Sequence, residues 1–574
     1  MTQVKFAERQ CFKSKTGRIP RACSFSLALF LTLGAAASHA AEVLTRHVRA
    51  GASIAMAEPV RDFPADQRMV LDVVLPLRDR KGLDAFVADV TNPASPNFRH
   101  YLTPAEFSAR FGPTQTDYDS TVQYLVKHGL TLTGGSRDGM DVQVSGPASV
   151  IEAAFNLRLR YYQHPTEGRL FFGPDREPTT SMDVPLWHVS GLDNYSIPHP
   201  LFVKKGDYAK AHGIRPDSVV TRATTGSGPS ASFLGSDMRA AYYGGASLTG
   251  AGQHLGLLEY AGTELADLDT YFRNAGQTNR VPITLLSTDG TATSCDPSVC
   301  DDGEQTLDMT QALGMAPGLA SLTMYVGSTD TAILSAMTTR NPLPMTIGCS
   351  WGWTPADPST LDPYFEKMAA QGQSFFAASG DSSTWSTTNE AWPADSAYVI
   401  SVGGTDLTTG SAAGAWKAET AWSDSGGGVS PDRIAIPSWQ KIRGVINSSN
   451  KGSTTYRNGP DVSANADFTF YVCANQTDCT ANEFGGTSFA APMWAGFIAL
   501  ANQQAAALRK APVGYFNPLI YAQNQVNGAL TPAYTASFHD IASGISGSYL
   551  AVKGYDLVTG WGSPKADLIT TLIR

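Results

Sequence analysis

The pattern of hydrophobic and polar residues differs between two regions of the chain. In residues 43–200, the alternating segments DVQVSG and RLRYYQ are typical of strands. LDAFVADV, STVQYLVKHG and ASVIEAAFN instead have helical spacing of apolar residues. This mixture predicts a small α+β domain with its own core.

Beyond residue 235 the apolar segments become continuous. HLGLLEY, SLTMYVG, PMTIGCSWG, QSFFAASGD and YVISVGGT indicate buried strands, and helical segments such as GEQTLDMTQALGM and LDPYFEKMAAQG lie between them. Buried strands that alternate with helices predict an α/β fold whose mostly parallel sheet is covered on both faces. Reactive groups gather at the carboxyl ends of such strands, where SWG (350–352) and SGD (379–381) stand.

Two further segments suggest processing. Residues 201–235 are polar, basic and rich in Gly, Ser and Pro, which predicts an exposed linker open to proteolysis. In residues 1–40, six basic residues precede an apolar run at 25–33, and Ser38 and Ala40 are small residues at the −3 and −1 positions of a cleavage site. We expect a signal peptide, export to the outside or the periplasm, and no membrane attachment after its removal. An uncleaved anchor is the alternative.

Composition and charge narrow the function. The chain is 42% hydrophobic and 16% charged, with 54 Gly and 34 Pro, as in loop-rich globular proteins. Residues 231–574 carry 16 Lys+Arg against 29 Asp+Glu, which argues against nucleic acid as a partner. Few basic residues also limit self-repulsion once carboxylates are protonated, so the larger region suits acid.

The cysteines favour an oxidising compartment. Cys349 lies in an apolar segment, where it is expected to be a buried hydrophobic residue. The other cysteines after residue 235 form two closely spaced pairs, for which zinc binding is the alternative to disulfides. The histidines after residue 235, His254 and His539, are near neither pair in sequence, which argues against zinc. Two local disulfides are therefore expected, in Cys295/Cys300 and Cys473/Cys479.

The segment EFGGTSFAAPMWAG presents Ser488 at the start of an apolar helix. Serine there is commonly a helix cap. It can also be a nucleophile, since a helix N-terminus supplies N–H groups to a developing oxyanion. The Gly-x-Ser-x-Gly pattern of α/β-hydrolases is broken by Ala490. These residues alone leave both roles open.

A nucleophilic serine needs a base, and carboxylates are better placed than the two histidines. Glu304 and Asp308 are four residues apart on a predicted helix, so they share a face and raise each other's pKa. A solvated acidic helix start is the alternative. Asp381 ends a predicted strand, either as a turn residue or, when protonated, as a hydrogen-bond donor to an oxyanion.

GEQTLD, SWG, SGD, VGGT, GPDVSANAD and GGTSFAAP occur in an order that resembles the sedolisin family of serine-carboxyl peptidases. Residues 43–200 resemble that family's activation domain, of the kumamolisin precursor type. The resemblance implies a subtilisin-like peptidase domain over 236–574. It also implies Ser488 as nucleophile, Glu304 as general base, Asp308 as the residue that orients Glu304, and Asp381 as the oxyanion-hole acid.

The resemblance also concerns residues around these four. Glu259 and Trp351 match positions that extend the Glu–Asp relay in some members, although a buried structural role is equally expected. Where the family commonly has Ser-Gly after its oxyanion Asp, this chain has Ser382 and Ser383. That departure is expected to change a loop or a pocket and to leave the acid in place.

The C-terminal segment FHDIASG…AVKGYDLVTGWGSP resembles the family's calcium loop. The resemblance implies one structural Ca²⁺ held by the side chains of Asp540 and Asp556 and the carbonyls of Ile541, Val552 and Gly554. From the residues alone, a hydrogen-bonded turn is the alternative.

The sequence thus predicts a secreted, acid-acting serine-type endopeptidase, made as a zymogen and monomeric. Its partners would be protein or peptide substrates and its own prodomain, which acts as an intramolecular inhibitor. A glycosidase that uses Glu304 and Asp308 is one alternative, but it leaves Ser488 and Asp381 without roles. A non-catalytic secreted binding protein is the other.

Overall fold

The structure is a computed structural model that describes residues 41–48, 58–219, 225–389 and 391–574. All described residues belong to one compact unit. The predicted signal peptide at 1–40 therefore lies outside the described residues. Within the described segments, no helix has both the length and the apolar character that a membrane crossing requires.

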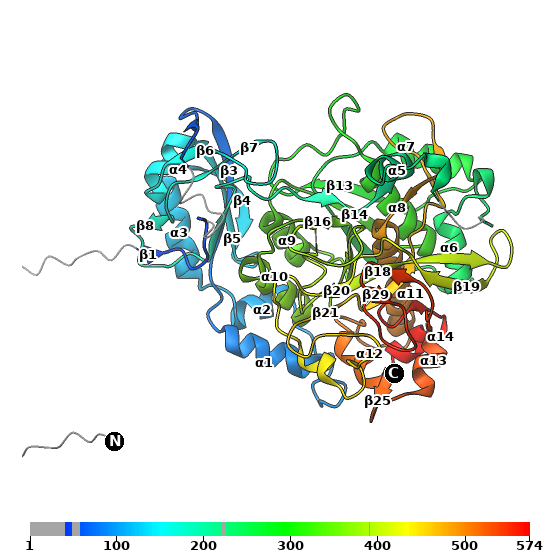
Figure 1. The fold of residues 1–574 in the computed structure, drawn as a ribbon. Coiled ribbons are helices and arrows are strands. Elements are labelled where there is room, and N and C mark those ends of the chain that lie inside the picture. Colours follow the sequence, from blue (N-terminus) through cyan, green and yellow to red (C-terminus); the bar gives the residue numbers. More distant parts are fainter. Residues whose placement is uncertain (1–40, 49–57, 220–224, 390) are drawn as a thin grey trace, which may run out of the picture. The chain divides into compact units, whose positions relative to one another are not determined.

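The N-terminal part of this unit has the predicted α+β structure (Figure 1). Its main sheet is antiparallel, in the order β4 (Thr131–Ser136), β5 (Asp141–Pro147), β3 (Arg68–Val74) and β9 (His188–Ser190). Helices α3 (Gln115–Lys127) and α4 (Ala148–Phe155) contact β5. Alternate apolar residues on the strands enter a core with α4, which includes Leu71, Val73, Val142, Val144 and Ile151.

The second part is built on an eight-stranded sheet, in which seven strands are parallel. The strand order is β13 (Ile283–Ser287), β14 (Ser321–Val326), β12 (His254–Glu259), β15 (Thr346–Cys349), β17 (Ser374–Ala378) and β18 (Ile400–Thr409). The antiparallel β19 (Trp416–Ala421) and the parallel β22 (Val462–Asn465) both pair with β18.

Helices flank this sheet (Figure 1). Helices α8 (Gly303–Met315) and α11 (Ala490–Ala507) pack against each other, and α11 contacts β15, β17 and β22. Helices α9 (Asp330–Thr339) and α10 (Pro358–Gln371) form a second pair that contacts β14 and β17. The predicted α/β class with helices covering a mostly parallel sheet is confirmed.

The two parts meet where α9 and α10 contact β3, β5 and α1 (Arg80–Val90). Ser335 Oγ of α9 donates to Asp141 Oδ1 of β5 at 2.7 Å. Arg80 of α1 forms an ion pair of 2.8 Å with Glu366 of α10. The N-terminal part is therefore attached through polar as well as apolar contacts.

The predicted linker has more structure than expected. After β10 (His199–Pro200), residues Val203–Lys204 form β11 and Lys205–Ala211 form α5. Ala209 is fully buried in a small cluster with Trp422 and Phe468. The polar composition of residues 201–235 gave no sign of this packing, because one apolar face is enough to anchor a short helix.

Candidate active site

Ser488 is presented at the start of α11, as the sequence predicts. β24 (Thr480–Gly485) ends at Gly485, Gly486 turns the chain with φ of 140°, and a 3-10 turn over Thr487–Phe489 leads into α11. Ser488 is 0% exposed, and its Oγ donates to Glu304 Oε2 at 2.9 Å. The hydroxyl that the sequence left as cap or nucleophile is therefore paired with a carboxylate from another helix.

Glu304 and Asp308 lie one turn apart in α8 and are 1% and 0% exposed. The alternative of a solvated acidic helix start is therefore wrong. The two carboxyl groups are buried because α8 is covered on all sides, one of them by α11. Ser350 Oγ, directly after β15, donates to Asp308 Oδ1 at 2.7 Å.

Burial dominates the electrostatics of this pair. It raises the pKa of Glu304 well above its ordinary value, and the neighbouring Asp308 raises it further. Burial also raises the pKa of Asp308 to about 8, although the hydrogen bond from Ser350 opposes this. Glu259, at the end of β12, is fully buried beside Asp308 and also has a raised pKa. The carboxyl groups of Glu259, Glu304 and Asp308 therefore share one site that is buried from solvent.

Glu259 and Trp351, which the resemblance matched to an extended Glu–Asp relay, contact each other. Trp351 Nε1 donates to Glu259 Oε2 at 3.0 Å. Glu259 is thereby linked both to Asp308 and to Trp351, the residue that follows Ser350.

Asp381 stands three residues after the end of β17 and contacts the turn over Thr487–Phe489 that carries Ser488. Its Oδ1 accepts hydrogen bonds from the Thr487 N–H at 2.8 Å and from Thr487 Oγ1 at 2.9 Å. Ser383 has φ of 59°, a conformation that glycine adopts without steric cost. Its N–H donates to the Asp424 carbonyl at 3.0 Å, so the loop is closed despite the missing glycine.

The segment before β11 passes directly over Ser488. Strand β10 pairs antiparallel with β16 (Trp351–Gly352), and the Leu201 N–H donates to the Ser350 carbonyl at 2.8 Å. The Leu201 carbonyl accepts from the Ser488 N–H at 3.0 Å. Beyond it, β11 pairs antiparallel with β24. The chain is therefore extended on both sides of the Leu201–Phe202 peptide bond, with that bond at the serine.

Gly486 permits this close approach. A Cβ atom on Gly486 would lie 2.6 Å from the Leu201 carbonyl oxygen and 2.7 Å from Asp381 Oδ2. These two oxygens therefore border the same small space beside Ser488.

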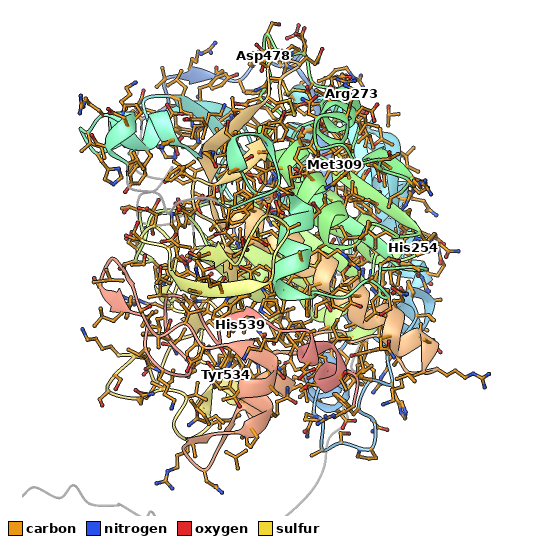
Figure 2. The ribbon with its side chains drawn as sticks, turned by 90° about the vertical axis from the view of Figure 1, so that its right-hand side faces the viewer. His254, Arg273, Met309, Asp478, Tyr534 and His539 are labelled. Carbon is orange, nitrogen blue, oxygen red and sulfur yellow. A yellow bond between two sulfur atoms is a disulfide. The ribbon has the colours of Figure 1, made fainter. Side chains whose placement is uncertain are left out.

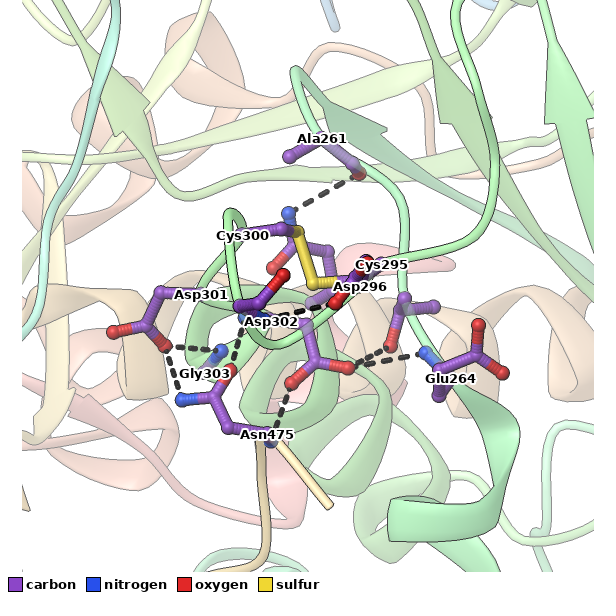
Figure 3. Close-up of a disulfide and its surroundings, with 12 residues drawn as sticks. Ala261, Glu264, Cys295, Asp296, Cys300, Asp301, Asp302, Gly303 and Asn475 are labelled. Atoms are coloured by element: carbon purple, nitrogen blue, oxygen red, sulfur yellow. Dashed lines mark hydrogen bonds between the residues drawn. A yellow bond between two sulfur atoms is a disulfide. The ribbon is translucent and has the colours of Figure 1, made fainter. Parts of the chain in front are cut away.

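A network not foreseen from the sequence fixes the start of α8 (Figure 3). Asp302 Oδ1 accepts from the Asn475 N–H at 2.7 Å, and the Asp302 N–H donates to Asn475 Oδ1 at 2.9 Å. The Thr263 hydroxyl and the Glu264 N–H also donate to Asp302. Asp302 lies close to Cys300 in sequence and Asn475 close to Cys473. The two predicted disulfides are confirmed, and free Cys349 is buried as expected. The bonded pairs are Cys295–Cys300 and Cys473–Cys479.

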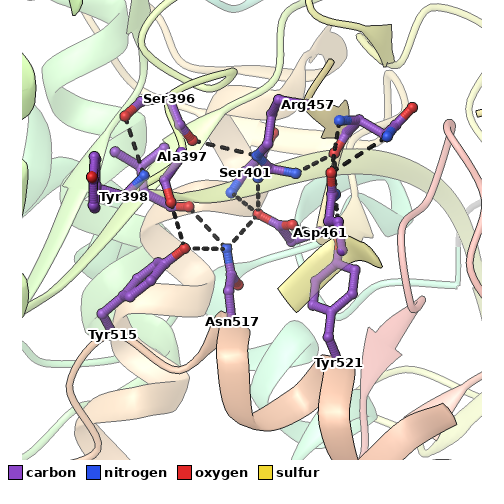
Figure 4. A network of polar contacts seen from close by, with 12 residues as sticks. Ser396, Ala397, Tyr398, Ser401, Arg457, Asp461, Tyr515, Asn517 and Tyr521 are labelled. Carbon is purple, nitrogen blue, oxygen red and sulfur yellow. Dashed lines mark hydrogen bonds and ion pairs between the residues drawn. The ribbon is translucent and has the colours of Figure 1, made fainter. Parts of the chain in front are cut away.

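The GPDVSANAD motif has a structural role (Figure 4). Asp461 forms a fully buried ion pair with Arg457 at 2.5 Å and accepts a hydrogen bond from the Ser401 N–H in β18. Asn517 and Tyr521 of α12 (Asn517–Asn524) also donate to Asp461. The motif thus ties β18 to the C-terminal helices.

The two histidines are engaged elsewhere, in separate regions of the molecule (Figure 2). His254 Nδ1 is 2.8 Å from Ser321 Oγ. His539 stacks on Trp416, with ring centroids 3.9 Å apart. Neither contact involves Ser488, in agreement with the expectation that carboxylates are better placed than the two histidines to serve it as a base.

In the C-terminal loop, Asp540 and Asp556 hold the same turn. Asp540 Oδ1 accepts from the Gly554 N–H and Asp556 Oδ2 from the Val552 N–H, both at 2.9 Å. Burial raises the pKa of Asp556 to about 7. Ile541 is buried directly after Asp540. The described residues contain no group of three or more His, Cys, Asp or Glu that could hold a metal, so any site here depends on backbone carbonyls.

Comparisons with known proteins match both parts of the chain. The pro-kumamolisin activation domain matches residues 57–194, and the subtilase family matches residues 304–526. Kumamolisin of Bacillus sp. (strain MN-32) is 32% identical over 554 residues, which are 91% of this chain and 94% of kumamolisin. Sedolisin of Pseudomonas sp. (strain 101) is 27% identical over 557 residues, 90% of this chain and 89% of sedolisin.

Among solved structures, Pseudomonas sedolisin, a serine-carboxyl proteinase, is 28% identical, with a TM-score of 0.49. The match covers 61% of this chain and 98% of that one. With 32% identity to kumamolisin over nearly its full length, this chain belongs to the sedolisin family of serine-type peptidases and carries that family's activation domain.

Proposed function

We propose that the protein is a secreted serine-carboxyl endopeptidase that acts in acid and is made as a zymogen. One observation carries the proposal: a peptide carbonyl, that of Leu201, lies at the N–H of the serine whose hydroxyl donates to Glu304. Such an arrangement suits acyl transfer from a peptide bond to Ser488.

In this mechanism Ser488 Oγ attacks the peptide carbonyl as its proton passes to Glu304 Oε2. Glu304 then returns the proton to the leaving amine. Water hydrolyses the resulting acyl-enzyme by the same two steps in reverse. Asp308 and Glu259 position Glu304 and set its proton affinity, because a charge on any one of three adjacent buried carboxyls disfavours charge on the others.

The oxyanion would be stabilised by the Ser488 N–H and by Asp381. A protonated Asp381 donates through Oδ2, which borders the same space as the Leu201 carbonyl oxygen, while Oδ1 is fixed by Thr487. Donors that are already in place lower the barrier without reorganisation.

These assignments account for acid action. Glu304 must be ionised to accept a proton, whereas Asp381 must be protonated to donate one. Rising pH disfavours the protonated form of Asp381 that would donate to the oxyanion, so activity falls. Falling pH protonates Glu304 and removes the base. Because burial raises the pKa of Glu304 well above its ordinary value, this loss begins at a higher pH than for an exposed glutamate, and the pH profile is bell-shaped.

The same contacts explain latency. Strands β10 and β11 occupy both sides of Ser488, so the precursor segment blocks other substrates. The Leu201–Phe202 bond, at the start of the predicted processing segment 201–235, is the first bond that the serine would cut. The activation domain would remain an inhibitor until that cut and the loss of its acid-sensitive polar contacts.

We further propose one structural calcium ion in the C-terminal loop. Carboxylates of Asp540 and Asp556 on one turn, with the carbonyls of Ile541, Val552 and Gly554, form the oxygen-rich donor set that this ion prefers. When bound, the ion would supply a positive charge to buried Asp556. The residues themselves hold the turn through their contacts with the Val552 and Gly554 N–H groups.

Peptide hydrolysis by purified protein tests the peptidase function. The acidified wild type is expected to cleave casein, whereas Ser488→Ala and Glu304→Gln lose activity by about 10³-fold or more, because nucleophile and base act as one unit. Casein cleavage by both variants at the wild-type rate would refute the assignment. Cleavage of oligosaccharides instead would favour the glycosidase alternative.

A further inference from the structure

The segment over Ser488 shows where the enzyme would bind the side chains that follow the cleaved bond of a substrate. Counted from the Leu201–Phe202 bond, Phe202 is the first residue after the bond, Val203 the second and Lys204 the third. Val203 and Lys204 are held as a strand against Gly485 and Phe484 of β24. Because a strand has a fixed repeat, the third side chain of any substrate bound in this way reaches the same place.

At that place Lys204 meets Asp301. Lys204 Nζ lies 2.7 Å from Asp301 Oδ2, and the two side chains are 36% and 50% exposed. Lys204 Nζ also lies 5.8 Å and 5.5 Å from the ring centroids of Phe202 and Phe484, within the range of cation–π attraction.

Asp301 is held in place independently of Lys204. Its Oδ1 accepts from Asn475 Nδ2 at 2.8 Å and from the Gly303 N–H at 3.1 Å (Figure 3). Its other oxygen, Oδ2, is the one that meets Lys204. The Cys295–Cys300 disulfide ends at the preceding residue. The carboxylate is therefore an ordered part of the site.

Asp301 also suits an acid enzyme. Partial burial alone would raise the pKa of Asp301, but hydrogen bonds from Lys204 and Asn475 outweigh burial and lower it. The carboxylate consequently keeps its charge where ordinary carboxylates begin to lose theirs.

We propose that Asp301 is a specificity-determining residue that favours Lys or Arg at the third position after the cleaved bond. This inference rests on the proposed peptidase function and extends it to the class of substrate. The enzyme would thus prefer peptides with a basic residue shortly after the cut, as its own precursor has.

The test uses acid-activated enzyme and four peptides based on residues 197–208, IPHPLFVKKGDY, with Lys, Arg, Gln or Glu at the Lys204 position. Lys and Arg peptides are expected to exceed the Gln peptide in kcat/KM by about two- to fivefold, the range of a half-exposed ion pair. The Glu peptide should fall below Gln. Raising the ionic strength should shrink these ratios.

Variants separate specificity from a general structural effect. Asp301→Asn should remove the preference and Asp301→Lys should reverse the Lys-to-Glu ratio, whatever happens to absolute rates. Asp296→Asn removes an exposed carboxylate from the same disulfide loop and should keep the wild-type ratio.

Two failures are distinguishable. If the wild type cleaves none of the four peptides or casein, the proposed function itself is wrong. If it cleaves all four with equal kcat/KM, or if Asp301→Lys leaves the ratio unchanged, the peptidase stands and the role of Asp301 is overturned.

Discussion

Gly486→Ala is expected to slow the first self-cleavage by about 100-fold while leaving the protein folded. The added Cβ would lie 2.6 Å from both the Leu201 carbonyl oxygen and Phe202 Cα, and 2.7 Å from Asp381 Oδ2. Non-bonded Cβ contacts essentially never fall under 3.0 Å, so these atoms must move by about 0.4 Å, and by about 0.8 Å to reach ordinary contact. Misplacement of nearly 1 Å at a reacting group costs up to about 100-fold in rate.

The backbone adds to this effect, because φ of 140° at Gly486 is unfavourable for alanine by about 1–3 kcal/mol. The assay follows the intact chain by electrophoresis and mass spectrometry after acidification, with thermal unfolding measured at the same pH. Gly206→Ala in α5 is the matched control, since a Cβ there meets nothing within 4 Å. A folded Gly486→Ala precursor that is cut within about threefold of the wild-type rate would refute the reasoning.

Three further predictions follow from the same geometry. Asp381→Ala should lower kcat by about 10²–10³-fold, the usual effect of losing an oxyanion donor, and an unchanged kcat would exclude Asp381 from that role. The Ser488→Ala precursor should unfold at lower temperature as pH rises from about 4 to about 8. The reason is that Asp308, with a pKa of about 8, stays protonated when folded but ionises when unfolded; Asp308→Asn should flatten this slope. Removal of calcium by a chelator should lower the unfolding temperature. The lost stability is about 2.7 kcal/mol if calcium was at 100 times its Kd, and the Asp556→Asn variant should show no such loss.

Much of the fold could be predicted because its signals are local. The apolar runs around Leu257 and Phe376 indicated buried strands, and the turn before Ser488 indicated a helix start; all three are present. Short cysteine spacing likewise sufficed for both disulfides. These predictions need only residues that are neighbours along the chain.

The site itself needed contacts between distant residues. Spacing placed Glu304 and Asp308 on one helix face, but it left a solvated and a buried pair equally open, because burial is imposed by α11 almost 200 residues later. The order of the motifs, rather than any single motif, suggested that Ser488 and Glu304 meet.

Other features had no sequence signal. The pairing of Asn475 with Asp302 joins residues 173 positions apart, and nothing in either segment indicates the partner. The position of Leu201 over Ser488 depends on the edges of β16 and β24, with which β10 and β11 pair. The polar, Gly-rich composition of residues 201–235 indicated an exposed segment, whereas backbone hydrogen bonds to neighbouring strands hold its first residues in the site.

The most direct test of the account is the identity of the first bond cut after acidification. Precursors of the wild type, Ser488→Ala and Glu304→Gln are acidified and sampled by intact mass from the earliest times. The account predicts that the wild type first yields a fragment ending at Leu201 and a chain beginning at Phe202, and that neither variant yields them. A first cut elsewhere in the wild type, or the same cut in Ser488→Ala, would contradict it.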